Sequence, residues 1–268
     1  MRRSLEGRVA LVTGGGRGIG RAVAVKLGTA GASVVVNDLT ADVAEDAAAA
    51  VRGAGGQAVS CVGDVTDEEF PRRFVDTARD SFGAIDIVVN NAGYATYGEV
   101  VDLPDGAWQP MLDVLLTAPF RILRAAGPHF RDDRRDRGIG KVVNVSSVGG
   151  ISGSPGSAGY AAAKAGLLGF TRTLAKEWGS WGVTVNAVAP GLTRTRLTEG
   201  SAGGHDSIDI SGERIPLTGV PLRELEKQIP LRRIGEPEDV ANAVYLLCLP
   251  ESDYMTGEVL VVGGGWLP

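Results

Sequence analysis

Residues 13–20 read Thr-Gly-Gly-Gly-Arg-Gly-Ile-Gly and lie between a short apolar run at 9–12 and a helical pattern over 18–30. Glycines leave room for backbone N–H groups to approach a phosphate, and the N-terminus of the following helix offers partial positive charge. A plain glycine turn is the competing interpretation, because 39 of the 268 residues are glycine. The choice between the two therefore depends on what precedes and follows this stretch.

Short β-branched runs alternate with longer helical patterns along the chain. Near-continuous apolar runs indicate strands that are buried on both faces, as in a parallel sheet. Their alternation with helices predicts βαβ units. We therefore expect an α/β fold, a single doubly wound domain over 1–268 with a mostly parallel sheet and helices on both faces. The expected strands are 9–12, 33–36, 58–62, 85–89, 142–145, 183–188 and 259–262, and the expected helices are 18–30, 41–54, 66–82, 105–126, 157–179 and 236–248.

Composition and charge exclude several classes of protein. The net charge of −5 argues against a nucleic-acid partner, and no run approaches the roughly 18 apolar residues of a membrane helix. Cys61 and Cys248 lie far apart and make no metal-ligand spacing. The mixed charges of 131–137 predict a solvated loop. We expect a soluble, reduced, cytoplasmic protein without a metal.

Residues 192–228 do not follow the alternation of apolar runs and helical patterns. They hold five glycines and two prolines and show little periodicity. Loops longer than about 12–15 residues inside a compact domain are usually functional lids or disordered segments. Both interpretations remain open from the pattern alone.

Two acidic residues follow the second and third expected strands. Asp38 comes 18 residues after Gly20, where a carboxylate accepts hydrogen bonds from ribose hydroxyls. This context turns the glycine-rich stretch into a predicted dinucleotide site. Asp64 suits either a contact with adenine or the N-cap of a helix that starts at Thr66.

A second group of residues carries acid–base chemistry. Among five tyrosines, only Tyr160 has a lysine four residues later, Lys164, so both side chains lie on one helix face. A surface pair is disfavoured because the neighbouring residues 161–166 are otherwise alanine and glycine. Ser147 precedes Tyr160 by thirteen residues. A hydroxyl, a phenol and an ammonium group are thus expected together.

These motifs, taken in order, resemble those of the short-chain dehydrogenase/reductase family. The glycine-rich stretch is followed by Asn-Asn-Ala-Gly at 90–93 and by the Ser147, Tyr160 and Lys164 set. Pro-Gly-Leu-Thr-Arg-Thr at 190–195 and Thr-Gly at 256–257 also match. The resemblance spans about residues 5–266.

The resemblance implies a seven-stranded Rossmann sheet and an oxidoreductase that moves hydride between a nicotinamide cofactor and a carbonyl or secondary alcohol. It makes Tyr160 the acid/base, has Ser147 polarise the substrate oxygen, and makes 192–228 a substrate lid. It also implies a homotetramer or homodimer. The residues expected to bind the cofactor are Gly14, Gly16, Arg17, Gly18, Ile19, Gly20, Asp38, Asp64, Val65, Asn91, Gly93, Tyr160, Lys164, Pro190, Gly191, Thr193 and Thr195.

The sequence contains opposing signals for the choice of cofactor. Asp38 would repel a 2′-phosphate by about 4 kcal/mol per charge pair at about 4 Å and an effective dielectric of about 20. Arg17 sits where members of the family that prefer NADP carry a basic residue. We expect NAD, with NADP as the alternative.

The sequence does not decide the substrate class or the consequence of one changed catalytic position. Candidate substrates are 3-oxoacyl thioesters, small alcohols and ketones, sugars or polyols, and steroid-like alcohols. Residues 192–228 hold five basic and six acidic residues, a poor docking surface for an acidic carrier protein. Leu115 replaces the Asn that the family uses as a fourth catalytic residue, which keeps a catalytically idle NAD-binding regulator or scaffold as the alternative function.

Overall fold

The computed structural model describes residues 3–132, 137–199, 207–210, 213–216 and 220–267. Seven strands form one sheet in the order β3-β2-β1-β4-β5-β6-β9. Every neighbouring pair in this sheet is parallel, so it is fully and not mostly parallel. The strands are β1 Val9–Val12, β2 Ser33–Asp38, β3 Gln57–Val62, β4 Ile87–Asn90, β5 Gly140–Val145, β6 Val183–Pro190 and β9 Val259–Val262. The predicted doubly wound α/β fold is confirmed.

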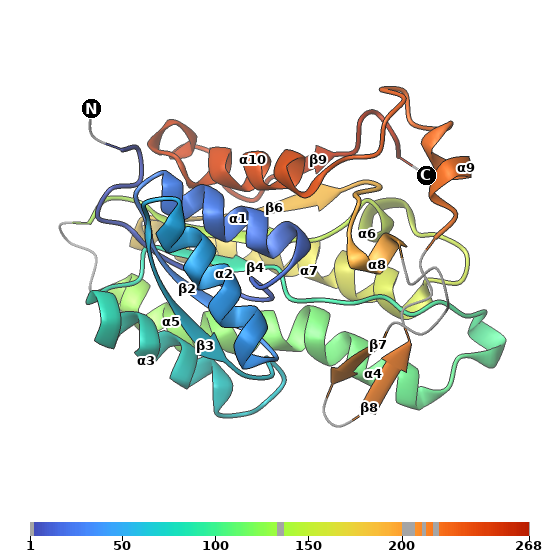
Figure 1. The fold of residues 1–268 in the computed structure, drawn as a ribbon, viewed down its shortest axis with the longest axis horizontal. Helices are drawn as coiled ribbons and strands as arrows, with labels where there is room; N and C mark the ends of the chain where they lie inside the picture. The colour runs from blue at the N-terminus through green and yellow to red at the C-terminus, as the bar shows by residue number, and fades with distance from the viewer. Residues whose placement is uncertain (1–2, 133–136, 200–206, 211–212, 217–219, 268) are drawn as a thin grey trace.

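Helices cover both faces of this sheet (Figure 1). Successive residues of a strand point to opposite faces, and in β1 Leu11 joins one apolar core while Val12 joins the other. The first core is completed by α3, α5 and α7, and the second by α1, α2 and α10. The helices are α1 Gly18–Thr29, α2 Ala41–Gly53, α3 Phe70–Phe82, α4 Asp105–Leu112, α5 Ala118–Asp132, α6 Gly149–Ser152, α7 Ala158–Trp178, α8 Arg196–Glu199, α9 Leu222–Glu226 and α10 Pro237–Cys248, with the short turns η1 Val100–Asp102, η3 Gly179–Trp181 and η4 Pro250–Ser252.

Two predicted helices have different boundaries. Helix α3 begins at Phe70 and not at Thr66, because Pro71 suits the first turn of a helix. The predicted helix over 105–126 is instead α4, a π-helical segment η2 Asp113–Thr117, and α5, which continues to Asp132. At the end of η2 the Ala118 N–H donates to the carbonyl of Asp113, five residues earlier, which is the hydrogen bond of a π-helix. Prolines at 110 and 119 lack the N–H that an uninterrupted α-helix needs.

A buried ion cluster closes the end of the sheet opposite the carboxyl ends of its strands. The Asp86 side chain is fully buried and pairs with Arg137 and, at 3.3 Å, with Arg8, while Val9 N donates to Asp86 Oδ2 at 2.9 Å. Burial alone would raise the pKa of Asp86, but the hydrogen bonds from Arg137 and Val9 hold it below its ordinary value. Arg137 therefore departs from the solvated loop predicted for 131–137, of which residues 133–136 lie outside the described part of the chain.

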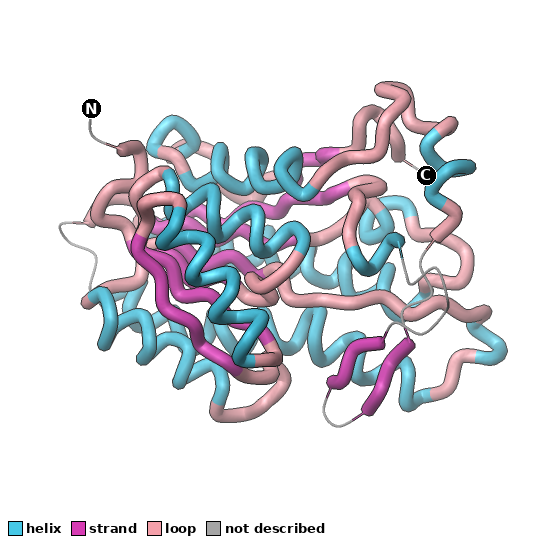
Figure 2. Tube along the Cα trace, viewed as in Figure 1, coloured by secondary structure: helices cyan, strands magenta, loops and turns pink. Residues whose placement is uncertain are grey.

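The segment 192–228 carries secondary structure that its weak periodicity did not predict. It contains α8, the antiparallel hairpin β7 Ser207–Ile210 and β8 Glu213–Pro216, and α9. Figure 2 shows the hairpin standing apart from the main sheet. The glycines of this segment, at 200, 203, 204, 212 and 219, lie outside the described residues. Across the part of the chain that the structure describes, no helix is both long and apolar enough to cross a membrane.

Candidate active site

A cavity of about 630 Å³ lies at the carboxyl ends of the strands, where ligands bind in open α/β sheets. Its volume falls in the range of small-molecule and cofactor sites. Of the predicted site residues, Gly16 is not on its wall. The predicted residues that line it are Gly14, Arg17, Gly18, Ile19, Gly20, Asp38, Asp64, Val65, Asn91, Gly93, Ser147, Tyr160, Lys164, Pro190, Gly191, Thr193 and Thr195.

The glycine-rich loop is packed too tightly for side chains. A Cβ on Gly20 would lie 2.0 Å from the Gly14 carbonyl oxygen, and one on Gly14 would lie 2.8 Å from the Cα of Ala92. Gly14 also has a φ of 57°, which favours glycine. Asn91 Nδ2 donates to the carbonyl oxygens of Thr13 and Gly14, both at 3.0 Å. The end of β4 thus holds the loop in a shape that exposes backbone to the cavity.

Asp38 ends β2 beside this loop. Its Oδ2 accepts from Gly16 N at 3.0 Å, and its Oδ1 accepts from Leu39 N at 2.8 Å. A Cβ on Gly16 would lie 2.5 Å from Asp38 Oδ2. Gly16 therefore positions the carboxylate instead of facing the cavity. An acceptor-only carboxylate beside exposed glycine backbone fits the ribose hydroxyls and phosphates of a dinucleotide.

Two further residues shape the nucleotide end of the cavity. Asp64 Oδ1 accepts from Thr66 N at 2.8 Å and Thr66 Oγ1 at 2.7 Å, so Asp64 closes a local turn and is not the cap of α3. Asn37, whose role was not predicted from the sequence, is buried. Its Nδ2 donates to the Gly63 carbonyl at 2.9 Å and its Oδ1 accepts from Gly14 N at 3.3 Å. The signal in the sequence that could have identified it is an asparagine directly after the apolar run of β2.

Ser147, Tyr160 and Lys164 meet at the other end of the cavity. Ser147 follows β5, while Tyr160 and Lys164 project from α7. Lys164 is buried, its Nζ donates to the Val145 carbonyl at 2.6 Å, and Nζ lies 5.8 Å from the centroid of the Tyr160 ring. A Cβ on Gly150 would lie 2.7 Å from the Lys164 backbone carbon. This close approach of α6 to α7 brings Ser147 to the face of the helix that carries Tyr160.

Burial shifts the pKa values of Tyr160 and Lys164 in the directions that favour their neutral forms. Burial raises the pKa of Tyr160 to about 12; a hydrogen bond with Ser147 opposes this effect and the nearby Tyr97 adds to it. Burial lowers the pKa of Lys164 to about 8. At neutral pH the phenol therefore holds its proton, and positive charge beside it is needed to release that proton.

Leu115 lies in η2 and lines the same cavity. It is buried, and a Cβ on Gly93 would meet its Cδ2 at 2.6 Å and Lys164 Nζ at 3.8 Å. In an α-helix the Leu115 carbonyl would accept from residue 119, but Pro119 has no N–H. The apolar side chain of Leu115 thus borders the site close to Lys164, and its carbonyl lacks the ordinary helical donor.

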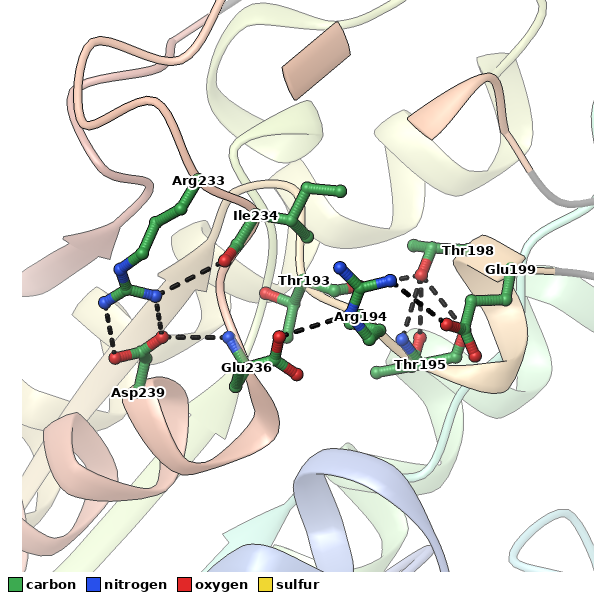
Figure 3. A network of polar contacts seen from close by, with 9 residues as sticks. All are labelled: Thr193, Arg194, Thr195, Thr198, Glu199, Arg233, Ile234, Glu236 and Asp239. Atoms are coloured by element: carbon green, nitrogen blue, oxygen red, sulfur yellow. Dashed lines mark hydrogen bonds and ion pairs between the residues drawn. The ribbon is translucent and has the colours of Figure 1, made fainter. Parts of the chain in front are cut away.

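Hydrogen bonds hold the beginning of the segment 192–228 (Figure 3). Thr198 Oγ1 donates to the Thr193 carbonyl at 2.7 Å and accepts from Thr195 N at 2.9 Å. Arg194 pairs with Glu236 at 3.2 Å, which links this turn to the N-terminus of α10. Thr193 and Thr195, both on the cavity wall, are positioned in this way.

Comparison with known proteins identifies the family of this chain. A family model described as enoyl-(acyl carrier protein) reductase matches residues 14–267. The short-chain reductase protein NovJ of Streptomyces niveus is 40% identical over 261 residues, covering 96% of this chain and 93% of that protein. The chain belongs to the short-chain dehydrogenase/reductase family.

Two other relatives are nearly as similar. The 3-oxoacyl-[acyl-carrier-protein] reductase FabG of Vibrio harveyi is 37% identical over 262 residues, covering 98% of each chain. A crystal structure of a protein from Agrobacterium tumefaciens, described as a candidate 2-deoxy-D-gluconate 3-dehydrogenase with bound NADP, has a TM-score of 0.83 at 34% identity. The match covers 99% of this chain and 98% of that chain.

Family membership identifies the reaction class. This short-chain dehydrogenase/reductase is an oxidoreductase that transfers hydride between a nicotinamide cofactor and a small-molecule substrate. The alternative of a catalytically idle regulator is not supported.

Proposed function

We propose that the protein is an NAD-dependent dehydrogenase of secondary alcohols and reductase of the corresponding carbonyl compounds, with Tyr160 as its acid/base. The observation that carries this proposal is the meeting of Ser147, Tyr160 and Lys164 in the cavity whose far end holds the glycine-rich loop and Asp38. The bound nicotinamide supplies the acceptor or donor of hydride.

The residues then have separate tasks. The Ser147 hydroxyl donates a hydrogen bond to the substrate oxygen. Tyr160 donates its proton to that oxygen in reduction and takes a proton from it in oxidation. Lys164, held by the Val145 carbonyl, places positive charge near the phenol and stabilises the phenolate. Each unit by which the pKa of Tyr160 falls toward the working pH needs about 1.4 kcal/mol of this stabilisation.

A panel of secondary alcohols tests the proposal. Absorbance at 340 nm, read with NAD and with NADP, should rise with at least one alcohol of the panel. No increase with any alcohol and either cofactor, in protein that binds NADH, would contradict the proposed reaction.

We predict a preference for NAD, which Asp38 supports. Its carboxylate is held by Gly16 N and Leu39 N, where it would repel a 2′-phosphate. The ratio of kcat/KM for NAD over that for NADP should exceed about 10, equivalent to about 1.4 kcal/mol, and Asp38→Ala should reduce this ratio. Steady-state kinetics with both cofactors measure it.

A matched control is Asp42→Ala. Asp42 is exposed in the first turn of α2 and is not on the cavity wall, so the variant removes the same charge nearby and should leave the ratio unchanged. A wild-type preference for NADP would mean that Arg17, which also lines the cavity, outweighs Asp38.

We also propose that 1–268 is one domain in which 192–228 acts as the substrate lid. Its described residues Arg196, Leu197, Thr198 and Ser207 line the cavity, and Arg196 Nη2 donates to the Ser207 carbonyl at 2.8 Å. NAD plus substrate should therefore slow amide hydrogen exchange in 192–228. Exchange that is already slow in the free protein and does not change on binding would mean that the segment is fixed structure.

Leu115→Asn should change kcat by less than about tenfold, which corresponds to about 1.4 kcal/mol of barrier. The substitution alters the side chain but leaves the backbone carbonyl, which Pro119 deprives of its α-helical donor. Turnover of both forms on the same alcohol measures the effect. An increase in kcat of a hundredfold or more would show that Leu115 strongly lowers the activity of the natural enzyme.

For assembly and location, we propose a homotetramer or homodimer in the cytoplasm. Val261 on the edge strand β9 and Leu246 on α10 are exposed apolar residues, which supports a partner subunit there. Cys61 and Cys248 are free thiols, which fits a reducing compartment.

A further inference from the structure

The end of the cavity that holds the proposed acid/base has apolar and aromatic walls. Tyr94, Val114, Leu115 and Leu197 line it. These four residues and Tyr160 belong to one apolar cluster, in which Tyr94 and Leu115 are each 1% exposed. The substrate would therefore meet carbon surface beside the reacting oxygen.

Tyr97 forms the outer part of this wall. It lines the cavity, and the residue is 45% exposed. Gly98 N donates to the Gly156 carbonyl at 2.8 Å, and Gly98 forms a bridge with Ser157, immediately before α7. The chain around Tyr97 is thereby fixed to the start of the helix that carries Tyr160. The two phenols lie close enough for Tyr97 to raise the pKa of Tyr160.

Several polar side chains of the cavity lie away from Tyr160 or already have a protein partner, as Arg196 does at the Ser207 carbonyl, 2.8 Å away. Asp38 and Asp64 lie at the nucleotide end, and the amides of Asn37 and Asn91 bind the glycine-rich loop. Among the described lining residues, none of the wall residues beside Tyr160 carries a carboxylate or an amide. A sugar or polyol has several hydroxyl groups, which would lose their hydrogen bonds to water there without gaining enough hydrogen bonds from the protein.

We propose that the substrate is a secondary alcohol or ketone whose carbon framework next to the reacting carbon is apolar, an alkyl or aryl group that packs against Tyr97. This inference rests on the proposed function. In oxidation the Tyr160 phenolate would take the hydroxyl proton, and the C–H bond of the carbinol carbon would break as the hydrogen leaves with its electron pair. The nicotinamide would accept this hydride, and the C=O bond would form. The wall selects the substrate by its carbon framework.

The experiment compares kcat/KM for 1-phenylethanol, 2-propanol and D-gluconate, and for a 3-oxoacyl thioester in the reducing direction. We expect 1-phenylethanol to exceed 2-propanol at least tenfold and D-gluconate at least a hundredfold. Tyr97→Ala should lower kcat/KM at least tenfold for 1-phenylethanol but less than threefold for 2-propanol. Tyr97→Phe, which keeps the ring, should stay within threefold of the wild type.

Tyr254→Ala is the matched control, because Tyr254 is fully exposed and is absent from the cavity wall; all rates should be unchanged. Preference for D-gluconate or for the thioester would overturn the apolar substrate class and leave the proposed function standing. An equal loss on both alcohols in Tyr97→Ala would overturn the role of Tyr97. No turnover of any substrate would overturn the proposed function itself.

Discussion

Tyr160→Phe is expected to lower kcat at least 100-fold while the cofactor still binds. The substitution removes only the phenol oxygen, and the ring remains packed against the apolar cluster that holds it. General acid–base catalysis by one group contributes about 10²–10⁴-fold, and no other acid/base is proposed for the substrate oxygen. Steady-state turnover followed at 340 nm and an NADH titration measure the two quantities separately.

Tyr254→Phe removes the phenolic hydroxyl of an exposed side chain and should leave kcat unchanged. Nearly normal turnover of Tyr160→Phe, with NADH binding intact, would remove Tyr160 from the mechanism. Loss of NADH binding together with turnover would instead mean that the Tyr160 hydroxyl acts by holding the cofactor.

The second large effect is expected for Ser147→Ala, with a loss of about 10²-fold in kcat. One hydrogen-bond donor to a developing oxyanion is worth about 10²–10³-fold. Because such a donor acts mainly in the transition state, kcat and kcat/KM should fall together. Ser147 Oγ also accepts from Gly149 N at 3.1 Å, so circular dichroism should confirm that the turn after β5 is intact.

Two other serine variants sharpen this test. Ser147→Thr keeps a hydroxyl and should recover part of the lost rate. Ser152→Ala changes an exposed serine on α6, just after Ser147, and should have no effect. A rise in KM at unchanged kcat in Ser147→Ala would mean that Ser147 only binds the substrate.

The alternation of apolar runs and helices was enough to predict the doubly wound sheet, because a strand buried on both faces leaves few other arrangements. The break at Asp113–Thr117 was not predicted, since the helical pattern continues through it and only the prolines at 110 and 119 signal it. The hairpin β7–β8 was also missed, because it pairs only with itself and its apolar pattern is weak.

The positions of the site residues were predicted best where the spacing of residues along the sequence determines how their side chains lie in space. Tyr160 and Lys164 had to share a helix face, and Asp38 had to end a strand beside the glycine-rich loop. That Gly16 N donates to the Asp38 carboxylate was not predicted, because a glycine in such a loop can serve a neighbouring carboxylate as well as a ligand. Asn37 and the pairing of Asp86 with Arg137 were missed, since contacts between distant segments leave little trace in local sequence.

The most direct test of hydride transfer uses an oxidisable secondary alcohol that carries deuterium on its carbinol carbon. Mass spectrometry of the NADH formed should find the deuterium in the reduced cofactor. Wild-type turnover should also slow relative to the unlabelled alcohol if the C–H bond breaks in the limiting step. Tyr160→Phe should form the same labelled product at least 100-fold more slowly. Reduced cofactor without deuterium, or equal rates in the two proteins, would contradict the account.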